Sequence, residues 1–208
     1  MLIQLDKLAT SGPYDVIYAD PPWPYDDARC VGKQGVANQY ETLSPEDLAA
    51  LRIPAAKDCA LFLWATWPRL PLALETMKSW GFEYKSIAFV WVKLNPKEKP
   101  EGSEALNGPM IVQGGKWFST FYGLGRWTRG NTEMVLLGIK GKPHRVDPSV
   151  YQLLHEEEPI YEQRARHSAK PPVVRDKIVK LMGDCPRLEM FARGEIGGGW
   201  DHWGLEAT

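Results

Sequence analysis

The sequence predicts an α/β fold with a mostly parallel sheet and helices on both faces. Two observations carry this prediction. Short apolar runs rich in β-branched and aromatic residues recur along the chain, and segments with apolar residues at helical spacing separate them. Strands that alternate with helices in this way are typical of a sheet with helices packed on each side. With 208 residues the chain is long enough to form one domain with a full core.

The individual elements follow from local patterns. The expected strands are apolar runs that end at turn residues: 2–5, 15–19, 60–65, 86–92, 133–139 and 187–192. The expected helices carry apolar side chains on one face: 45–53, 70–77 and 174–181. Ser44 as the N-cap, followed by Pro45, marks the start of the first helix. The polar stretch 24–40 has no periodicity, so we expect a loop that gates the neighbouring turn.

The alternation of strands and helices breaks between residues 93 and 132. Gly, Pro, Asn and Lys dominate there, with aromatic residues interleaved. From Lys93 to Arg145 there are nine Lys and Arg against four Asp and Glu, a local balance of +5 in a chain of net charge −1. Basic and aromatic residues together suit phosphate contact and base stacking; a solvated loop region is the alternative. We therefore expect a single domain over 1–208, with 93–132 as an irregular target-recognition region.

Cysteine and histidine usage argues against disulfides and metal sites. Cys30, Cys59 and Cys185 lie far apart without a C-x-x-C motif, and the four histidines are scattered. Free cysteines predict a reducing, cytoplasmic compartment. We expect no signal peptide, and the apolar runs are shorter than the ~20 residues of a membrane helix.

The stretch best suited to chemistry is 18–23, Tyr-Ala-Asp-Pro-Pro-Trp. Pro21 and Pro22 have no backbone N–H, and each restricts its own φ and the residue before it. The result is a stiff turn that holds Asp20 and the adjacent carbonyl groups as hydrogen-bond acceptors. Trp23 adds an aromatic plane. The alternative interpretation is a strand end with two turn prolines and a core tryptophan.

Two fixed acceptors beside a ring suit a flat heterocycle that bears an NH2 group. The exocyclic nitrogen of adenine is a poor nucleophile, because its lone pair is delocalised into the ring. If Asp20 and the Pro21 carbonyl accept its two hydrogens, the lone pair points at an incoming methyl group, while Trp23 or Tyr25 stacks on the base. Catalysis then comes from positioning and placed acceptors, so it requires no protein nucleophile and no metal.

Four blocks of sequence occur in the order found in a known family: A-D-P-P-W at 19–23; L-F-L-W-A-T at 61–66 with W-V-K at 91–93; G-L-G-R-W-T-R-G-N-T-E-M-V-L-L-G-I-K-G at 123–141; and H-S-A-K-P at 167–171 with L-E-M-F-A-R at 188–193 and G-W-D-H-W-G at 199–204. Through these blocks the chain resembles the adenine-6-amino methyltransferases typified by the catalytic subunit of the mRNA adenosine methyltransferase. Bacterial and phage DNA enzymes belong to the same group. The blocks span nearly the whole chain.

The resemblance implies an S-adenosylmethionine-dependent enzyme with a permuted Rossmann-like fold, in which the catalytic turn comes early and the cofactor-binding strand comes last. Ligands of such sheets bind beyond the carboxyl ends of the strands. The resemblance assigns cofactor binding to Ser168, Lys170, Phe191, Arg193 and Glu206, with Lys170 on the methionine carboxylate and Arg193 near the ribose. It places Trp127 and Glu133 on the substrate side, and we expect Tyr25, Tyr40 and Arg129 to bind the substrate as well.

The sequence departs from the family pattern near its end. Glu195-Ile196 stands where many relatives have His-Asn, and Leu205 stands where they have Asn. The Leu205 side chain forms no hydrogen bonds, so we expect the ribose contact to shift to Glu206. These departures concern the cofactor contacts and not the catalytic turn.

The predicted activity is methyl transfer from S-adenosylmethionine to the 6-amino group of adenine in nucleic acid, on a flipped or single-stranded base. DNA is favoured because the chain looks like a compact bacterial or phage form without appended RNA-binding modules. RNA adenosine methylation and a non-catalytic nucleic-acid-binding subunit are the alternatives. Methylation of a protein glutamine is disfavoured, because ionised Asp20 is acceptor-only. With about 40 residues for target recognition, a homodimer or a helper subunit is one way to bind a duplex.

Overall fold

Strand β1 (Tyr14–Ala19) lies inside the parallel part of the sheet. The computed structural model describes residues 12–24, 42–98, 110–113, 116–120, 127–128, 130–157, 170–192 and 196–204. In it, β1 pairs in parallel with β2 (Ala55–Ala65) on one side and with β8 (Arg187–Met190) on the other. The short strand β9 (Asp201–Trp203) pairs in parallel with β8. Val16 and Ile17 are fully buried, as in a strand covered on both faces.

The described residues belong to two units. The first contains those from 1–88, 135–145 and 184–208, and the second contains those from 89–134 and 146–183. Strands β3 (Glu83–Glu98) and β6 (Thr132–Lys140) run from one unit into the other. The first unit has the strand order β6-β2-β1-β8-β9. The second has the order β4-β5-β3-β6, and β7 also pairs with β3; these additional strands are β4 (Met110–Gln113), β5 (Lys116–Thr120) and β7 (Leu153–Glu157).

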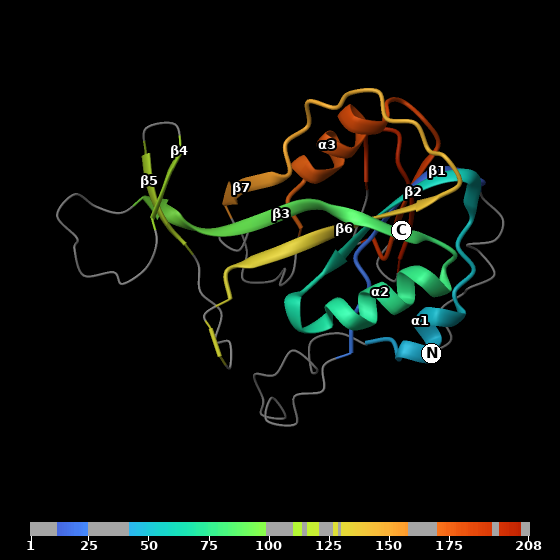
Figure 1. Ribbon diagram of the computed structural model, residues 1–208. Helices are drawn as coiled ribbons and strands as arrows, with labels where there is room; N and C mark the ends of the chain where they lie inside the picture. Colours follow the sequence, from blue (N-terminus) through green and yellow to red (C-terminus); the bar gives the residue numbers. More distant parts are fainter. Residues whose placement is uncertain are drawn as a thin grey trace. The chain divides into compact units, whose positions relative to one another are not determined.

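Two helices of the first unit pack on one another, α1 (Pro45–Ala50) and α2 (Leu70–Ser79), as Figure 1 shows. A short 3-10 helix, η4 (Trp67–Arg69), leads into α2. The predicted start of α1 is confirmed, since the Ser44 hydroxyl accepts a hydrogen bond from the Asp47 N–H at 3.0 Å. The Trp80 indole N–H, just after α2, donates to the Leu48 carbonyl at 2.7 Å. This buried bond fixes the end of α2 against α1.

Gly138 of β6 allows α2 to pack closely against the sheet. A Cβ atom at this position would lie 2.9 Å from the Met77 sulfur and 3.1 Å from the Phe82 Cβ. Both neighbours are buried, so neither has space to move aside. The predicted end of α2 near Gly81 is confirmed, because Gly81 has a φ of 82° and breaks the helical path.

The second unit contains helix α3 (Val173–Met182), which was predicted over 174–181. Strand β7 pairs in parallel with β3, from Val90 opposite Leu153 to Leu94 opposite Glu157. Strands β4 and β5 pair antiparallel, and Figure 1 shows them at the far end of β3. The expectation that 93–132 is irregular throughout is therefore wrong for the end of β3 and for β4 and β5. Strand β7 was not predicted at all.

Several strand boundaries also differ from the predicted ones. Strand β2 was expected from residue 60 but begins at Ala55, although Lys57 and Asp58 are exposed. Backbone pairing with β1, starting at Tyr14 opposite Ala55, extends the strand beyond its apolar part. Strand β8 ends at Met190 instead of Ala192. The predicted strand at 2–5 and residues 25–40 of the predicted gate lie outside the described residues.

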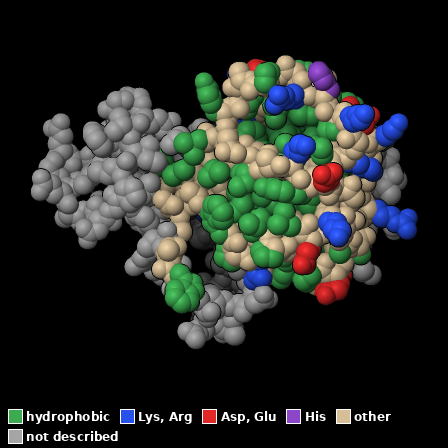
Figure 2. Space-filling view, in the orientation of Figure 1, with side chains coloured by type: hydrophobic (Ala, Val, Ile, Leu, Met, Phe, Trp, Pro, Cys, Tyr) green, Lys and Arg blue, Asp and Glu red, His purple; other side chains and the backbone are tan. Residues whose placement is uncertain are grey.

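Charged side chains of both signs occur on the face that Figure 2 shows. Several Lys and Arg side chains lie near one another at its upper right, and others are scattered with Asp and Glu side chains among them. Among the helices that the structure describes, none is long and apolar enough to cross a membrane.

Candidate active site

The carboxyl ends of the parallel strands in the first unit lie side by side. Ala19 of β1 is opposite Leu63 of β2 and also opposite Met190 of β8. The next residues, Asp20 and Phe191, therefore leave the sheet at the same edge. Side chains that follow parallel strands at one edge line a common crevice. The ends of β1 and β8 thus lie on the edge of the sheet where ligands were expected to bind, beyond the carboxyl ends of the strands.

The proline turn after β1 is fixed by backbone hydrogen bonds. The Trp23 N–H donates to the Pro21 carbonyl at 2.8 Å, which closes a three-residue turn around Pro22. The Leu43 N–H donates to the Pro22 carbonyl at 3.0 Å and ties the turn to the start of the α1 region. Asp20 is partly exposed at the beginning of this turn. The turn is thus as stiff as the two prolines predict, and it presents oxygen acceptors.

Trp23 is part of the core. Its side chain is only 6% exposed, and its indole N–H donates to the Trp64 carbonyl at 3.1 Å. A ring enclosed in this way has no free face for a base, so the prediction that Trp23 stacks on the substrate is wrong. The interpretation of Trp23 as a core tryptophan is correct for the ring, while the turn around it keeps its acceptors. The other predicted stacking residue, Tyr25, lies outside the described residues.

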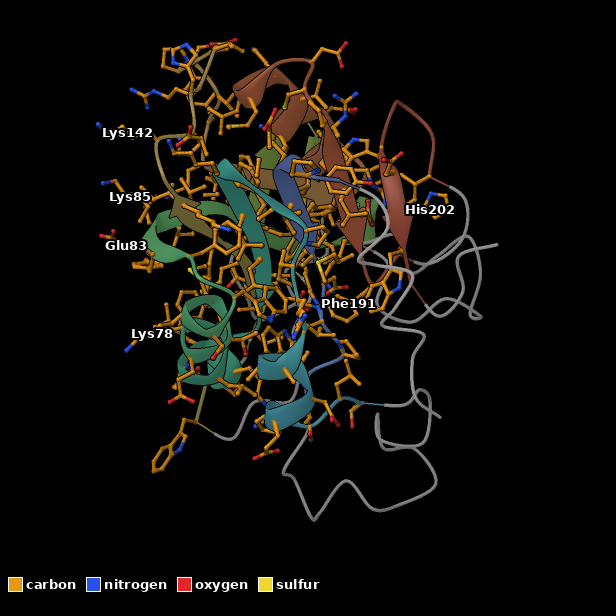
Figure 3. All side chains as sticks on the ribbon, turned by 90° about the vertical axis from the view of Figure 1, so that its right-hand side faces the viewer. Lys78, Glu83, Lys85, Lys142, Phe191 and His202 are labelled. Carbon is orange, nitrogen blue, oxygen red and sulfur yellow. The ribbon has the colours of Figure 1, made fainter. Side chains whose placement is uncertain are left out.

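Phe191 occupies an unusual conformation at the tip of β8. It has a φ of 64°, in the left-handed region that residues with a Cβ rarely adopt. Its ring packs edge-on against Trp203 at a centroid distance of 5.3 Å, and the Ala192 N–H next to it donates to the Trp203 carbonyl at 3.0 Å. Phe191 is partly exposed, and Figure 3 shows it away from Lys142, Lys85 and Glu83, which project outward from another side. The chain therefore turns sharply just beside Asp20.

Gly204 leaves room for this turn. A Cβ atom there would collide with the Ala192 carbonyl oxygen and lie 2.6 Å from the Ala192 nitrogen. Because these are backbone atoms, Gly204→Ala is expected to destabilise the fold by about 2 kcal/mol or more, and a urea titration measures the loss. Gly197→Ala is the matched control, since a Cβ atom at Gly197 would meet nothing within 4 Å. Equal effects of the two substitutions would contradict the close approach of Gly204 to Ala192.

Three charged side chains form a cluster in the second unit. Glu133 receives the Lys93 ammonium at 2.8 Å and the Lys170 ammonium at 3.5 Å. The Lys93 ammonium also lies 5.0 Å from the centroid of the Trp91 ring. Burial by itself would raise the pKa of Glu133, but the charges and hydrogen bonds of Lys170 and Lys93 outweigh it and hold the pKa below its ordinary value. Glu133 is thus ionised at neutral pH.

The other predicted site residues divide into two groups. Trp127 is 97% exposed, so its indole does not belong to the core. The rest lie outside the described residues, and their assignments stay predictions: Tyr25, Tyr40, Arg129, Ser168, Arg193 and Glu206.

Comparison with known proteins identifies the family. A protein-family model named MT-A70 matches residues 14–110 and 111–206. The chain belongs to the MT-A70 family. This confirms the resemblance inferred from the sequence blocks, and the parallel strands of the first unit are consistent with the predicted Rossmann-like methyltransferase fold.

Relatives of this MT-A70 chain include bacterial and animal proteins. The chain is 34% identical over 213 residues to the type II methyltransferase M.MunI from a Mycoplasma species, a match that covers 93% of this chain and 77% of the relative. It is 27% identical over 183 residues to METTL3, the catalytic subunit of a human N(6)-adenosine-methyltransferase, covering 88% of this chain and 26% of METTL3. It is 28% identical over 183 residues to an MT-A70-like protein of Drosophila melanogaster, covering 25% of that relative. The chain thus spans most of the bacterial relative and about a quarter of the animal ones.

Sequence patterns assigned no role to three residues, Lys93 of the second unit and Tyr18 and Trp64 of the first. Lys93 lies in the quoted W-V-K block, but nothing in the spacing indicates its bond to Glu133 across the fold. Tyr18 and Trp64 lie within apolar runs and look like ordinary core residues. A usable signal was their chemistry, since a buried Tyr hydroxyl or Trp N–H normally has a hydrogen-bond partner.

Proposed function

We propose that this chain transfers a methyl group from S-adenosylmethionine to the 6-amino group of adenine in nucleic acid, with DNA as the favoured polymer. The observation that carries the proposal is the fixed turn with Asp20 and the Pro21 carbonyl, at the edge where β1 and β8 end together. Family membership supports the methyltransferase activity. The name of METTL3, the catalytic subunit of an N(6)-adenosine-methyltransferase, supports the amino group of adenine as the target.

The turn acts by positioning the amino group. The Asp20 carboxylate accepts one of its hydrogens and the Pro21 carbonyl accepts the other. The Pro21 oxygen already receives the Trp23 N–H, but a carbonyl has two lone pairs and serves a second donor. With both hydrogens held, the nitrogen lone pair points toward the methyl group, and the carboxylate stabilises the positive charge that develops on nitrogen.

The residues present fit the proposed cofactor in their chemistry. S-adenosylmethionine, when bound, supplies an electrophilic methyl group on a sulfonium and carries a carboxylate at its other end. The Lys170 ammonium suits that carboxylate. It has three N–H donors, so its contact with Glu133 is compatible with a second acceptor. Phe191 lies at the tip of β8, the strand that the resemblance assigns to the cofactor.

Target recognition is proposed for residues 93–132. The exposed indole of Trp127 supports this role, because an aromatic face in contact with water is available for stacking on a base. The chain is also 34% identical to the type II methyltransferase M.MunI over 77% of that relative, against 27% identity over 26% of METTL3, which supports an activity of the M.MunI type.

Incubation with cofactor labelled in its methyl group tests the proposal. The protein is offered duplex DNA, single-stranded DNA and RNA of mixed sequence, and the recovered polymer is digested to nucleosides. Labelled 6-methyladenine from DNA is the expected product. The same base from RNA alone would transfer the proposal to the alternative substrate. Binding of the cofactor without labelling of any polymer would indicate a non-catalytic subunit, and labelled protein would overturn the nucleic-acid target.

A further inference from the structure

A series of hydrogen bonds leads from the catalytic turn into the sheet. The Trp23 indole N–H donates to the Trp64 carbonyl at the end of β2. The indole N–H of Trp64 itself donates to the Tyr18 hydroxyl of β1 at 2.7 Å. Trp64 is 1% exposed and Tyr18 is 3% exposed, so water does not compete for these bonds. The Trp23 ring is therefore held by the Trp64 carbonyl, and the Trp64 ring is held by the Tyr18 hydroxyl.

The same chain of contacts continues to the glycine-rich loop before β9. The Tyr18 ring packs at 58° against the Trp200 ring, with centroids 5.8 Å apart. The Arg187 guanidinium lies 5.6 Å from the centroid of the Trp200 ring, and it donates a hydrogen bond to the Gly198 carbonyl at 2.8 Å. Gly199 makes room for it, because a Cβ atom there would lie 2.7 Å from an Arg187 terminal nitrogen. Tyr18 thus has a fixed ring as well as a bonded hydroxyl.

We propose that Tyr18 and Trp64 are positioning residues for Asp20, acting through the buried ring of Trp23. The proposal rests on the methyltransferase function argued above and adds residues to it. Asp20 and Pro21 touch the amino group of the substrate. The Tyr18 hydroxyl fixes the orientation of the Trp64 ring, and the Trp64 carbonyl fixes the Trp23 ring. The backbone N–H of Trp23 in turn fixes the Pro21 carbonyl. The rigidity of the turn depends on all three steps.

Removing the Tyr18 hydroxyl would break this arrangement at its base. Tyr18→Phe leaves the Trp64 indole N–H buried without its acceptor, which is more costly than the loss of a bond that water can replace. Trp64 is expected to shift toward another acceptor, and its carbonyl moves with it. A small displacement of the acceptor atoms is enough to slow a reaction that depends on orientation.

Tyr14→Phe is the matched control for Tyr18→Phe. Tyr14 lies on the same strand, is also 3% exposed, and donates its hydroxyl hydrogen to the Asp201 carboxylate at 2.6 Å. It belongs to the amino end of β1, four residues before Tyr18 and away from the turn. Both substitutions remove one buried hydroxyl from one strand, so a general loss of stability would affect both variants.

Two measurements on the full chain test the proposal. Hydrogen exchange of the backbone amides of Trp23 and Leu43 reports the stiffness of the turn without any substrate. We expect exchange about tenfold faster in Tyr18→Phe and unchanged in Tyr14→Phe. In the methylation assay we expect kcat to fall on the order of tenfold or more in Tyr18→Phe, with the KM for cofactor and the Kd of S-adenosylhomocysteine unchanged.

Trp64→Phe provides a second route to the same step. It removes the indole donor, so adding Tyr18→Phe to it should change hydrogen exchange and kcat little. Equal exchange in Tyr18→Phe and Tyr14→Phe, or additive effects in the double variant, would overturn the proposal. Because the exchange experiment needs no turnover, a wild-type protein that methylates nothing would refute the proposed function and still leave the positioning step decided.

Discussion

Asp20→Ala is expected to lower the rate of methyl transfer about 10³-fold while the Kd for the cofactor stays unchanged. The reason is that the carboxylate is the charged acceptor at the turn, and removing one preorganised group of an electrostatic site typically has an effect of this size. Single-turnover methylation together with a calorimetric titration of S-adenosylhomocysteine separates the two quantities. Loss of cofactor binding in Asp20→Ala would show that Asp20 acts on the cofactor and not on the amino group.

The control for this substitution is Asp15→Ala. Asp15 also lies on β1, but near its amino end, where its N–H donates to the Pro186 carbonyl at 2.9 Å through the backbone. The alanine variant keeps that backbone bond. We expect methylation close to that of the wild type. Retained turnover in Asp20→Ala would refute the proposed mechanism directly.

Glu133→Gln is expected to destabilise the fold by about 3 kcal/mol, because breaking a buried ion pair leaves its partners without a countercharge. Glu133 serves two such partners, Lys93 and Lys170, and its side chain is 16% exposed. Glutamine has the same size but no charge, so packing is preserved. Urea unfolding at pH 7 measures the change. Asp147→Asn is the control, since Asp147 bonds Lys180 at 3.7 Å at the surface and should contribute little.

The same residue predicts how stability depends on pH. The pKa of Glu133 is lower in the folded chain than in the unfolded one, where a glutamate has a pKa of about 4.3. The folded state therefore binds fewer protons, and the stabilisation is fully present above that unfolded value. It is lost as the pH falls from about 4.3 through the depressed folded value. Glu133→Gln should flatten this part of the stability profile, and an unchanged profile would show that Glu133 is not the group responsible.

The catalytic turn was predictable because its cause is local. Two consecutive prolines after a β-branched run determine a stiff turn whatever surrounds them, and the structure has that turn at Asp20. The same reasoning failed for the Trp23 ring. Whether a tryptophan faces a ligand or the core depends on residues such as Trp64, which is distant in sequence. Composition near the turn contains no information about that contact.

The missed strands have a similar explanation. Strand β7 is five residues long, and its pairing with Val90 to Leu94 of β3 is what makes it a strand. Its own sequence, with two leucines followed by polar residues, has no clear alternation. The early end of β8 was equally hidden, because phenylalanine is not a residue that indicates a left-handed φ, and only the structure shows it at Phe191.

The contact between Arg187 and Gly199 has a consequence for how this chain can vary. Gly199 has a φ of 73°, and the space beside it is occupied by the guanidinium. A shorter residue at 187 would remove the collision with a Cβ atom at 199, but residue 199 would still need a positive φ. Asparagine is therefore the replacement for Gly199 that the loop accepts most easily. Substitutions at the two sites are therefore coupled during evolution: among homologues, a residue other than glycine at 199 should be found only with a smaller side chain at 187.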